Sequence, residues 1–223
     1  MTYGSRAAWA ALIAIIIIIA VGWWIKNPNV TKSDSPYQTA NVLLTSSGQT
    51  SSIMSKLITL QTNLGKITIG LYEQDAPNTV ANFSKLVSAG YYNGLTFHRV
   101  IPGFMIQGGD PNCSPESAKA PTTGPCGTGG PGYQFADELN PGTPSYQAGY
   151  RKGVVAMANS GPNTNGSQFF IMLEDYQLPN NYTIFGQVTA GQEIVDQIGQ
   201  TKTDAGDRPT TPITILSATV NES

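Results

Sequence analysis

The sequence has few charged residues, a single histidine and only two cysteines. Charged residues make up 12% of the 223-residue chain, and the formal net charge is −2. In typical soluble domains about a quarter of the residues are charged. Proteins that bind DNA or RNA neutralise phosphates with clustered Lys and Arg. The sequence therefore argues against nucleic acid as a partner.

Several common arrangements of catalytic or metal-binding residues are also missing. No G-x-S-x-G motif accompanies His98, the lone histidine, which argues against Ser-His-Asp hydrolysis. No pair of carboxylates is marked out for glycoside hydrolysis. Two cysteines and one distant histidine are too few ligands for a structural zinc ion. We therefore expect neither a metal nor a cofactor.

A long apolar run lies near the N-terminus. Residues 7–25 carry no charge and would span about 28 Å as a helix, close to the hydrocarbon thickness of a bilayer. Residues 1–26 are therefore predicted to be a single-pass membrane anchor. A cleavable signal peptide and a buried core helix are the alternatives. Residues 27–56 resemble a flexible polar linker, and 57–220 a compact domain.

Many short apolar stretches follow, with two helical patterns among them. Alternating apolar residues in 58–72, with a turn around 63–65, predict a β-hairpin. Residues 76–90 and 191–199 show helical spacing. Further strands are predicted at 95–101, 153–158, 167–173, 183–188 and 213–220. This pattern is typical of an antiparallel sheet or barrel.

Two loops contain motifs with more than one interpretation. Residues 127–132 match G-x-G-x-x-G, but no strand precedes them and no long helix follows, so a tight loop is favoured over a dinucleotide site. Residues 161–170 can be a polar turn into a core strand, with Asn165 and Gly166 at a hairpin corner, or part of a functional site.

The two cysteines, Cys113 and Cys126, enclose a loop of twelve residues. A disulfide explains them better than zinc does. Because cytosolic disulfides are rare, the pair also favours a location outside the cytoplasm. The charges that flank the apolar run do not decide its orientation.

Four motifs, in order, carry a resemblance to a known family. They are FHRVIPGFMIQGGD (97–110), GTGGPGYQFADE (127–138), VVAMANSGPNTNGSQFFI (154–171) and FGQV (185–188). Together they closely resemble the cyclophilin-type peptidyl-prolyl cis/trans isomerases over about residues 57–220. The resemblance implies a mainly β fold, a closed eight-stranded antiparallel barrel capped by two helices.

The resemblance also implies site residues. Arg99 matches the catalytic arginine, supported by His98, Phe104 and Gln107. The implied substrate-binding residues form an apolar proline pocket and an adjoining polar groove. They are Met105, Gly127, Thr128, Ala158, Asn159, Gln168, Phe170, Leu178 and Tyr182.

The chain departs from the family pattern at three places. Gln177 stands where the family has an indole, which puts cyclosporin binding in doubt, and Tyr182 replaces a pocket histidine. About eleven extra residues lie between Asp110 and Gly127.

The expected protein is a monomeric, membrane-anchored bacterial isomerase acting on proline-containing polypeptides outside the cytoplasm. The alternatives are a peptide-binding module or chaperone without turnover and, third, a purely structural interaction domain.

Overall fold

The computed structural model describes residue 54, residues 56–114 and residues 125–222. Within these residues no helix is both long and apolar enough to cross a membrane. The apolar run at 7–25 and most of the expected linker lie outside the described residues, so the anchor stays a prediction.

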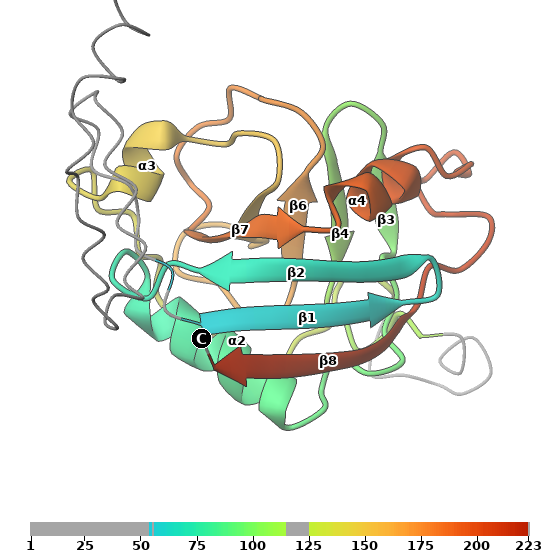
Figure 1. Cartoon of the computed structure of the whole chain (residues 1–223), viewed down its shortest axis with the longest axis horizontal. Coiled ribbons are helices and arrows are strands. Elements are labelled where there is room, and N and C mark those ends of the chain that lie inside the picture. The colour runs from blue at the N-terminus through green and yellow to red at the C-terminus, as the bar shows by residue number, and fades with distance from the viewer. Residues whose placement is uncertain (1–53, 55, 115–124, 223) are drawn as a thin grey trace, which may run out of the picture. The chain divides into compact units, whose positions relative to one another are not determined.

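Eight antiparallel strands form one strongly curved sheet (Figure 1). They are β1 (Lys56–Thr62), β2 (Gly65–Leu71), β3 (Arg99–Ile101), β4 (Met105–Gly108), β5 (Val154–Met157), β6 (Phe169–Met172), β7 (Ile184–Ala190) and β8 (Ile215–Glu222). Their order is β3-β4-β6-β5-β7-β2-β1-β8. The mainly antiparallel β fold expected from the sequence is confirmed.

The strands form a half-barrel rather than the expected closed barrel, because β3 and β8 are the two edges of the sheet. The chain just before β3 bridges this gap. Phe97 N–H donates to the Ile213 carbonyl at 2.9 Å, and Ile215 N–H donates to the Leu95 carbonyl at 2.8 Å. Strand β3 is shorter than the expected 95–101, because Leu95 and Phe97 bond to the first residue of β8 and to the chain just before it, whereas β3 pairs with β4.

The first hairpin is confirmed. Strands β1 and β2 pair from Lys56↔Leu71 to Thr62↔Gly65, which leaves a two-residue turn. The Thr62 hydroxyl accepts the N–H groups of Leu64 at 3.1 Å and Gly65 at 3.0 Å. These bonds satisfy the turn amides and help to fix the register on which inward and outward faces depend.

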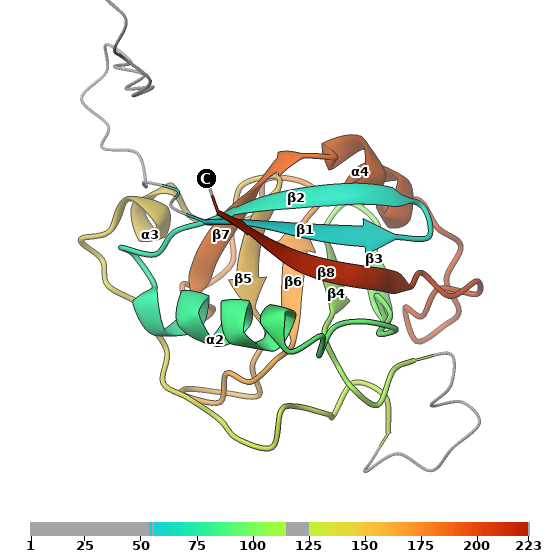
Figure 2. The same cartoon turned by 60° about the horizontal axis from the view of Figure 1, so that its bottom comes forward.

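The two predicted helices are present as α2 (Pro77–Ser88) and α4 (Gln192–Gly199), at opposite ends of the half-barrel (Figure 2). A third helix, α3 (Pro144–Ala148), was not expected, and its five residues are too few to show a helical period. Helix α2 packs on β8, and α4 packs against β2, β3 and β4. Phe83 of α2 lies at the centre of the core, with its ring 5.0–5.3 Å from those of three other aromatic residues.

Strand alternation divides the apolar residues into two clusters. On β4 and β6, Ile106, Phe169 and Ile171 point into the main core. Their neighbours Met105 and Phe170 point to the other face, into a second cluster. Because successive strand residues point to opposite faces, the sheet has an apolar outer surface as well as a filled interior.

The predicted disulfide is confirmed: Cys113 and Cys126 are bonded, with their Cα atoms 5.0 Å apart. The bond closes a loop across a sequence separation of 13 residues. In the chain-entropy model such a loop contributes about 3 kcal/mol to stability.

Candidate active site

One row of residues crosses four neighbouring strands on the outer face of the sheet. Arg99 of β3 pairs with Gln107 of β4, Gln107 with Phe170 of β6, and Phe170 with Ala156 of β5. Directly opposed residues of antiparallel strands project to the same face. Residues that are distant in sequence therefore form one surface, which changes from cationic to polar to apolar along the row.

His98 and Arg99 are adjacent in sequence but lie in different surroundings. His98 is 8% exposed, whereas the Arg99 side chain is 45% exposed. Burial lowers the pKa of His98 below its usual 6.5, because desolvation penalises the charged ring; Asp110 and the Thr96 backbone act against this shift, and Arg208 and Arg99 add to it. The imidazole is therefore neutral at pH 7.

The guanidinium of Arg99 is held from one side. Its Nε lies 3.4 Å from Oδ2 of Asp207, a contact that is more than 40% exposed on both sides. An exposed ion pair of this kind is worth less than about 1 kcal/mol. Its value lies in orientation, because an arginine held through Nε can still direct its two terminal nitrogens at a ligand.

The second apolar cluster contains the four residues that the resemblance places in the proline pocket, which are Phe104, Met105, Phe170 and Leu178, and also Tyr182. Met105 and Phe170 are buried in it, and Phe104, Leu178 and Tyr182 pack against it from its rim. The ring of Tyr182 meets that of Phe170 edge-on, with centroids 5.5 Å apart. Apolar walls beside the Arg99–Gln107 row give a compact ring such as proline a surface to bury.

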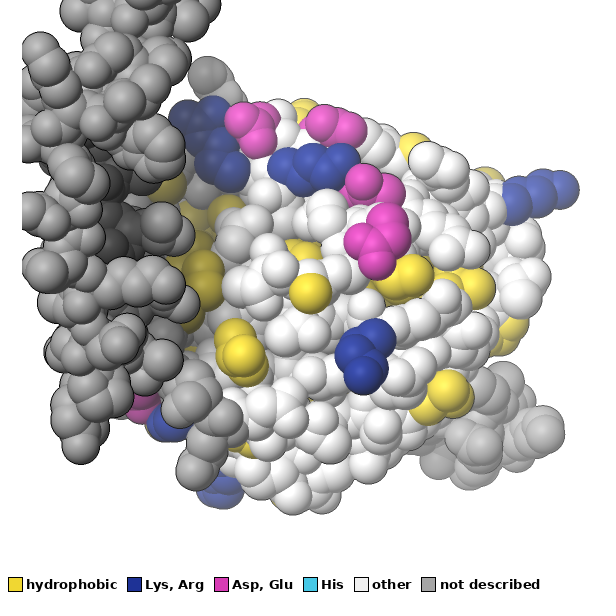
Figure 3. Space-filling model, in the orientation of Figure 1, with side chains coloured by type: hydrophobic (Ala, Val, Ile, Leu, Met, Phe, Trp, Pro, Cys, Tyr) yellow, Lys and Arg dark blue, Asp and Glu magenta, His cyan; other side chains and the backbone are white. Residues whose placement is uncertain are grey.

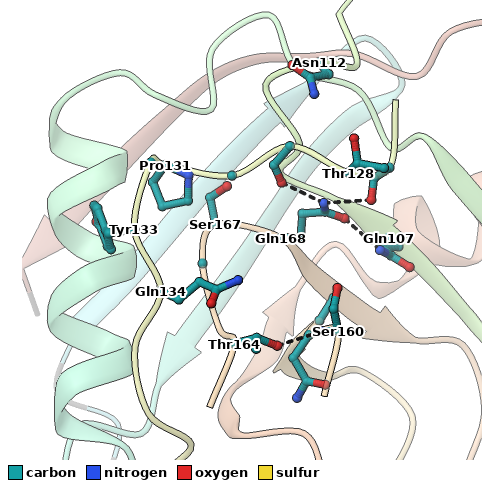
Figure 4. A pocket seen from close by; sticks show the side chains of 17 residues that line it. Gln107, Asn112, Thr128, Pro131, Tyr133, Gln134, Ser160, Thr164, Ser167 and Gln168 are labelled. Atoms are coloured by element: carbon teal, nitrogen blue, oxygen red, sulfur yellow. Dashed lines mark hydrogen bonds between the residues drawn. The ribbon is translucent and has the colours of Figure 1, made fainter. Parts of the chain in front are cut away.

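The expected polar groove is a cavity of about 640 Å³ next to this pocket. Six of the residues predicted for the site line it: Gln107, Gly127, Thr128, Ala158, Asn159 and Gln168. Figure 4 shows Gln107 and Gln168 side by side, with Thr128 near them. Gln107 belongs to both the row and the cavity, so it joins the pocket to the groove.

A network of amides fixes the groove wall. Gln107 Nε2 donates to Gln168 Oε1 at 2.9 Å. Gln168 Nε2 lies 2.8 Å from the Gly129 carbonyl and 3.2 Å from the Gly127 carbonyl. The two glutamines thus tie β4 and the residue just before β6 to the glycine-rich loop. The first helix after this loop is α3, so the loop does not open a long helix, as the sequence predicted.

Asp110 is the residue that sequence reasoning missed. It is fully buried, and its carboxylate accepts N–H groups from Asn112 at 2.7 Å, Gly127 at 2.6 Å and Gly129 at 2.9 Å. A side chain at Gly129 would collide with this carboxylate. An Asp whose carboxylate accepts the N–H group two residues later forms an Asx turn, which a sequence can suggest. The contacts of Asp110 with the distant Gly127 and Gly129 have no such local signal.

The hairpin-corner interpretation of Asn165 and Gly166 is wrong. Asn165 is fully buried, and its side-chain amide donates to Asp137 Oδ1 at 2.7 Å. Its backbone forms a bridge with Phe135. The loop between β5 and β6 is therefore pinned to the chain after the glycine loop, where it forms the far wall of the cavity.

A second unexpected residue is Tyr176, which is 50% exposed. Its ring lies over Phe104 with centroids 4.7 Å apart, whereas Gln177, at the family's indole position, is exposed. Tyr176, one position before Gln177, thus supplies an aromatic ring at the rim of the pocket.

Replacing Tyr176 by alanine is expected to raise the KM for an Ala-Pro peptide about threefold, because an aromatic contact of this size is worth about 0.5–1.5 kcal/mol. Tyr176→Phe, which retains the ring, should behave like the wild type. Steady-state kinetics of both variants test this, and equal KM values for the alanine variant and wild type would contradict the role.

The surface visible in Figure 3 shows sparse charge, in agreement with the composition. Acidic and basic side chains are interspersed on the described part of this face, with no continuous basic patch there.

Comparison with known proteins adds to this geometry. The family model "Cyclophilin type peptidyl-prolyl cis-trans isomerase/CLD" matches residues 57–220. Peptidyl-prolyl cis-trans isomerase-like 1 of Rhizopus delemar is 48% identical over 152 residues, covering 68% of this chain and 84% of that protein. The probable peptidyl-prolyl cis-trans isomerase A of Mycobacterium leprae is 44% identical over 187 residues, covering 76% of this chain and 94% of that protein.

Solved structures agree. A crystal structure of a cyclophilin-type peptidyl-prolyl cis-trans isomerase from Cryptosporidium parvum matches with a TM-score of 0.66 and 33% identity, covering 76% of this chain and 99% of that one. A second structure of that protein, obtained in the presence of the dipeptide Ala-Pro, matches with a TM-score of 0.65. By its family match and these relatives, the chain belongs to the cyclophilin-type peptidyl-prolyl cis-trans isomerases, a family of enzymes.

Proposed function

We propose that Arg99 accelerates rotation about X–Pro bonds by stabilising the twisted amide, while the second apolar cluster holds the proline ring. The observation that supports this most is the register that sets Arg99 and Gln107 beside Phe170 on one face. The Cryptosporidium parvum relative studied with Ala-Pro supports the same ligand class.

The chemistry needs no nucleophile. The barrier to amide rotation is about 18–20 kcal/mol, because resonance gives the C–N bond partial double-bond character. The two X–Pro isomers differ in free energy by only about 0.5–1 kcal/mol, so the uncatalysed reaction is limited by its rate and not by its equilibrium. In the twisted state the nitrogen regains its lone pair and accepts a hydrogen bond. A fixed guanidinium near that nitrogen stabilises the twisted amide more than the planar one.

The other site residues prepare this step. Phe104, Met105 and Phe170 immobilise the ring, so that the preceding carbonyl swings instead of the whole peptide. Gln107, held by Gln168, presents a fixed polar edge between the pocket and the groove. The groove then receives residues that flank the proline.

The isomerisation rate is expected to change less than about twofold between about pH 6.5 and 9, because the guanidinium stays charged and no general base takes part. Desolvation by burial lowers the pKa of His98, which favours the neutral ring in this window. Protonation of His98 lowers stability only as the pH falls below the unfolded-state value of about 6.5. A bell-shaped rate profile centred near pH 7 would contradict the mechanism.

We propose further that the chain is membrane-anchored, with the catalytic domain acting on exported proteins. The uncharged run at 7–25 and the Cys113–Cys126 disulfide support this. Protein taken from cells into a thiol-blocking reagent should therefore show no free thiol without reductant and two with it. Two free thiols in the untreated protein would contradict an oxidising location.

A further inference from the structure

The lone histidine lies beside the disulfide, although sequence reasoning treated it as distant. A ring nitrogen of His98 and the sulfur atoms of Cys113 and Cys126 all lie within 4.8 Å of one another. His98 and Cys113 are buried, and Cys126 is partly exposed. The segment just before β3 and the two ends of the inserted loop thus bring together three potential metal ligands.

The imidazole itself is poorly satisfied. Neither ring nitrogen of His98 has a well-formed hydrogen bond among the described residues, although the Thr96 backbone lies near enough to favour the protonated ring. A buried polar group without a well-formed hydrogen bond destabilises the folded state. Such a group needs an explanation, and the isomerase mechanism does not use this ring as acid or base.

The cysteines are held in place by more than their disulfide. The Cys113 carbonyl accepts both the N–H of Thr96 at 2.9 Å and its hydroxyl at 2.7 Å, and Cys113 N–H donates to the Asp110 carbonyl at 3.1 Å. Next to Cys126, Gly127 N–H donates to the Asp110 carboxylate at 2.6 Å. Reduction of the disulfide would leave these bonds intact, so both thiols would remain beside His98.

The geometry and charge of the reduced cluster suit a divalent cation. Zinc bonds of about 2.3 Å to sulfur and 2.0–2.1 Å to nitrogen place tetrahedral ligand atoms about 3.5–3.8 Å apart. The three ligand atoms here already lie within 4.8 Å, and the two sulfurs need only rotate apart. Two thiolates and one Zn²⁺ are neutral together, which lowers the cost of burial.

We propose that, once the disulfide is reduced, Cys113, Cys126 and His98 bind one Zn²⁺ ion, with a fourth position open to water. A dithiol reductant supplies two electrons and two protons and becomes a disulfide itself, which leaves two protein thiols. Zinc binding then releases these two protons to solvent. The ion and the disulfide exclude each other, and either one fastens Cys126, at the edge of the groove loop, to Cys113.

The full-length chain, reduced with a dithiol and kept free of oxygen, is the sample that tests this. Because the chain contains one histidine, ¹⁵N labelling of histidine gives the signals of a single imidazole. With ¹¹³Cd²⁺ as the probe, we expect direct coupling between cadmium and one ring nitrogen, and one equivalent bound. The oxidised chain should show neither.

Variants and competition titrations complete the test. Cys113→Ser/Cys126→Ser is the control that keeps side-chain volume and removes the thiolates, and it should not bind Zn²⁺ at micromolar concentration. His98→Asn should weaken Zn²⁺ binding by the reduced chain at least tenfold. Absence of Zn²⁺ binding by the reduced wild type would overturn the proposal. Cadmium binding without coupling to the ring would equally overturn it, whatever the folding of the variants.

Discussion

Arg99→Ala is expected to lower kcat/KM for an Ala-Pro peptide by about 100-fold, the loss typical when one donor to a developing charge or lone pair is removed. The guanidinium lies in register with Gln107 and next to the apolar cluster, and it is 45% exposed. The measurement is the cis-to-trans relaxation rate of the peptide at several enzyme concentrations.

Arg99→Lys is the matched variant for this experiment. It keeps a positive charge but loses the planar fork and the Nε contact with Asp207. We expect an intermediate loss of about tenfold, corresponding to about 1.4 kcal/mol. Both variants should unfold within about 1 kcal/mol of the wild type, because the ion pair is exposed. An alanine variant with wild-type kcat/KM would remove Arg99 from the mechanism.

Asp110→Ala is expected to have the largest effect on stability, a loss of at least about 3 kcal/mol in the free energy of unfolding, because each hydrogen bond to a buried charged group is worth about 1.5–3 kcal/mol. The substitution removes the shared acceptor for the N–H groups of Asn112, Gly127 and Gly129. Urea denaturation monitored by circular dichroism provides the measurement.

Asp110→Asn provides the control, because it keeps the shape and one acceptor oxygen but directs an amide group at backbone donors. Its loss should be smaller than that of alanine. In both variants the glycine loop loses its anchor, so KM should rise for peptides that extend into the groove more than for short ones. A loss below about 1 kcal/mol in Asp110→Ala would show that the loop is held by other contacts.

Local patterns in the sequence were enough to predict the hairpin and both longer helices. The alternation of Ile67 and Ile69 and the three- and four-residue spacing of Val80, Phe83 and Val87 reflect burial on one face, which the structure shows. The site as a whole came from the family resemblance, because Arg99, Gln107 and Phe170 become neighbours only through strand pairing.

The features that were missed depend on contacts between distant segments. Asp110 bonds to residues beyond the insertion, and His98 meets Cys126 across 28 positions of sequence. Asn165 reads locally as a turn residue, yet it is buried against the chain at Phe135. No pattern within ten consecutive residues predicts these contacts, because each depends on how the glycine loop packs on the sheet.

Catalysis of X–Pro isomerisation by this surface can be separated from binding of the peptide alone. Exchange NMR of an Ala-Pro peptide at equilibrium with the full-length chain separates the two, because binding shifts the peptide signals and catalysis produces exchange between cis and trans. The wild type should produce cis–trans exchange on the millisecond-to-second scale, and Arg99→Ala should abolish this exchange while the peptide shifts are retained. Shifted signals without exchange in the wild type would contradict catalysis and identify a binding module.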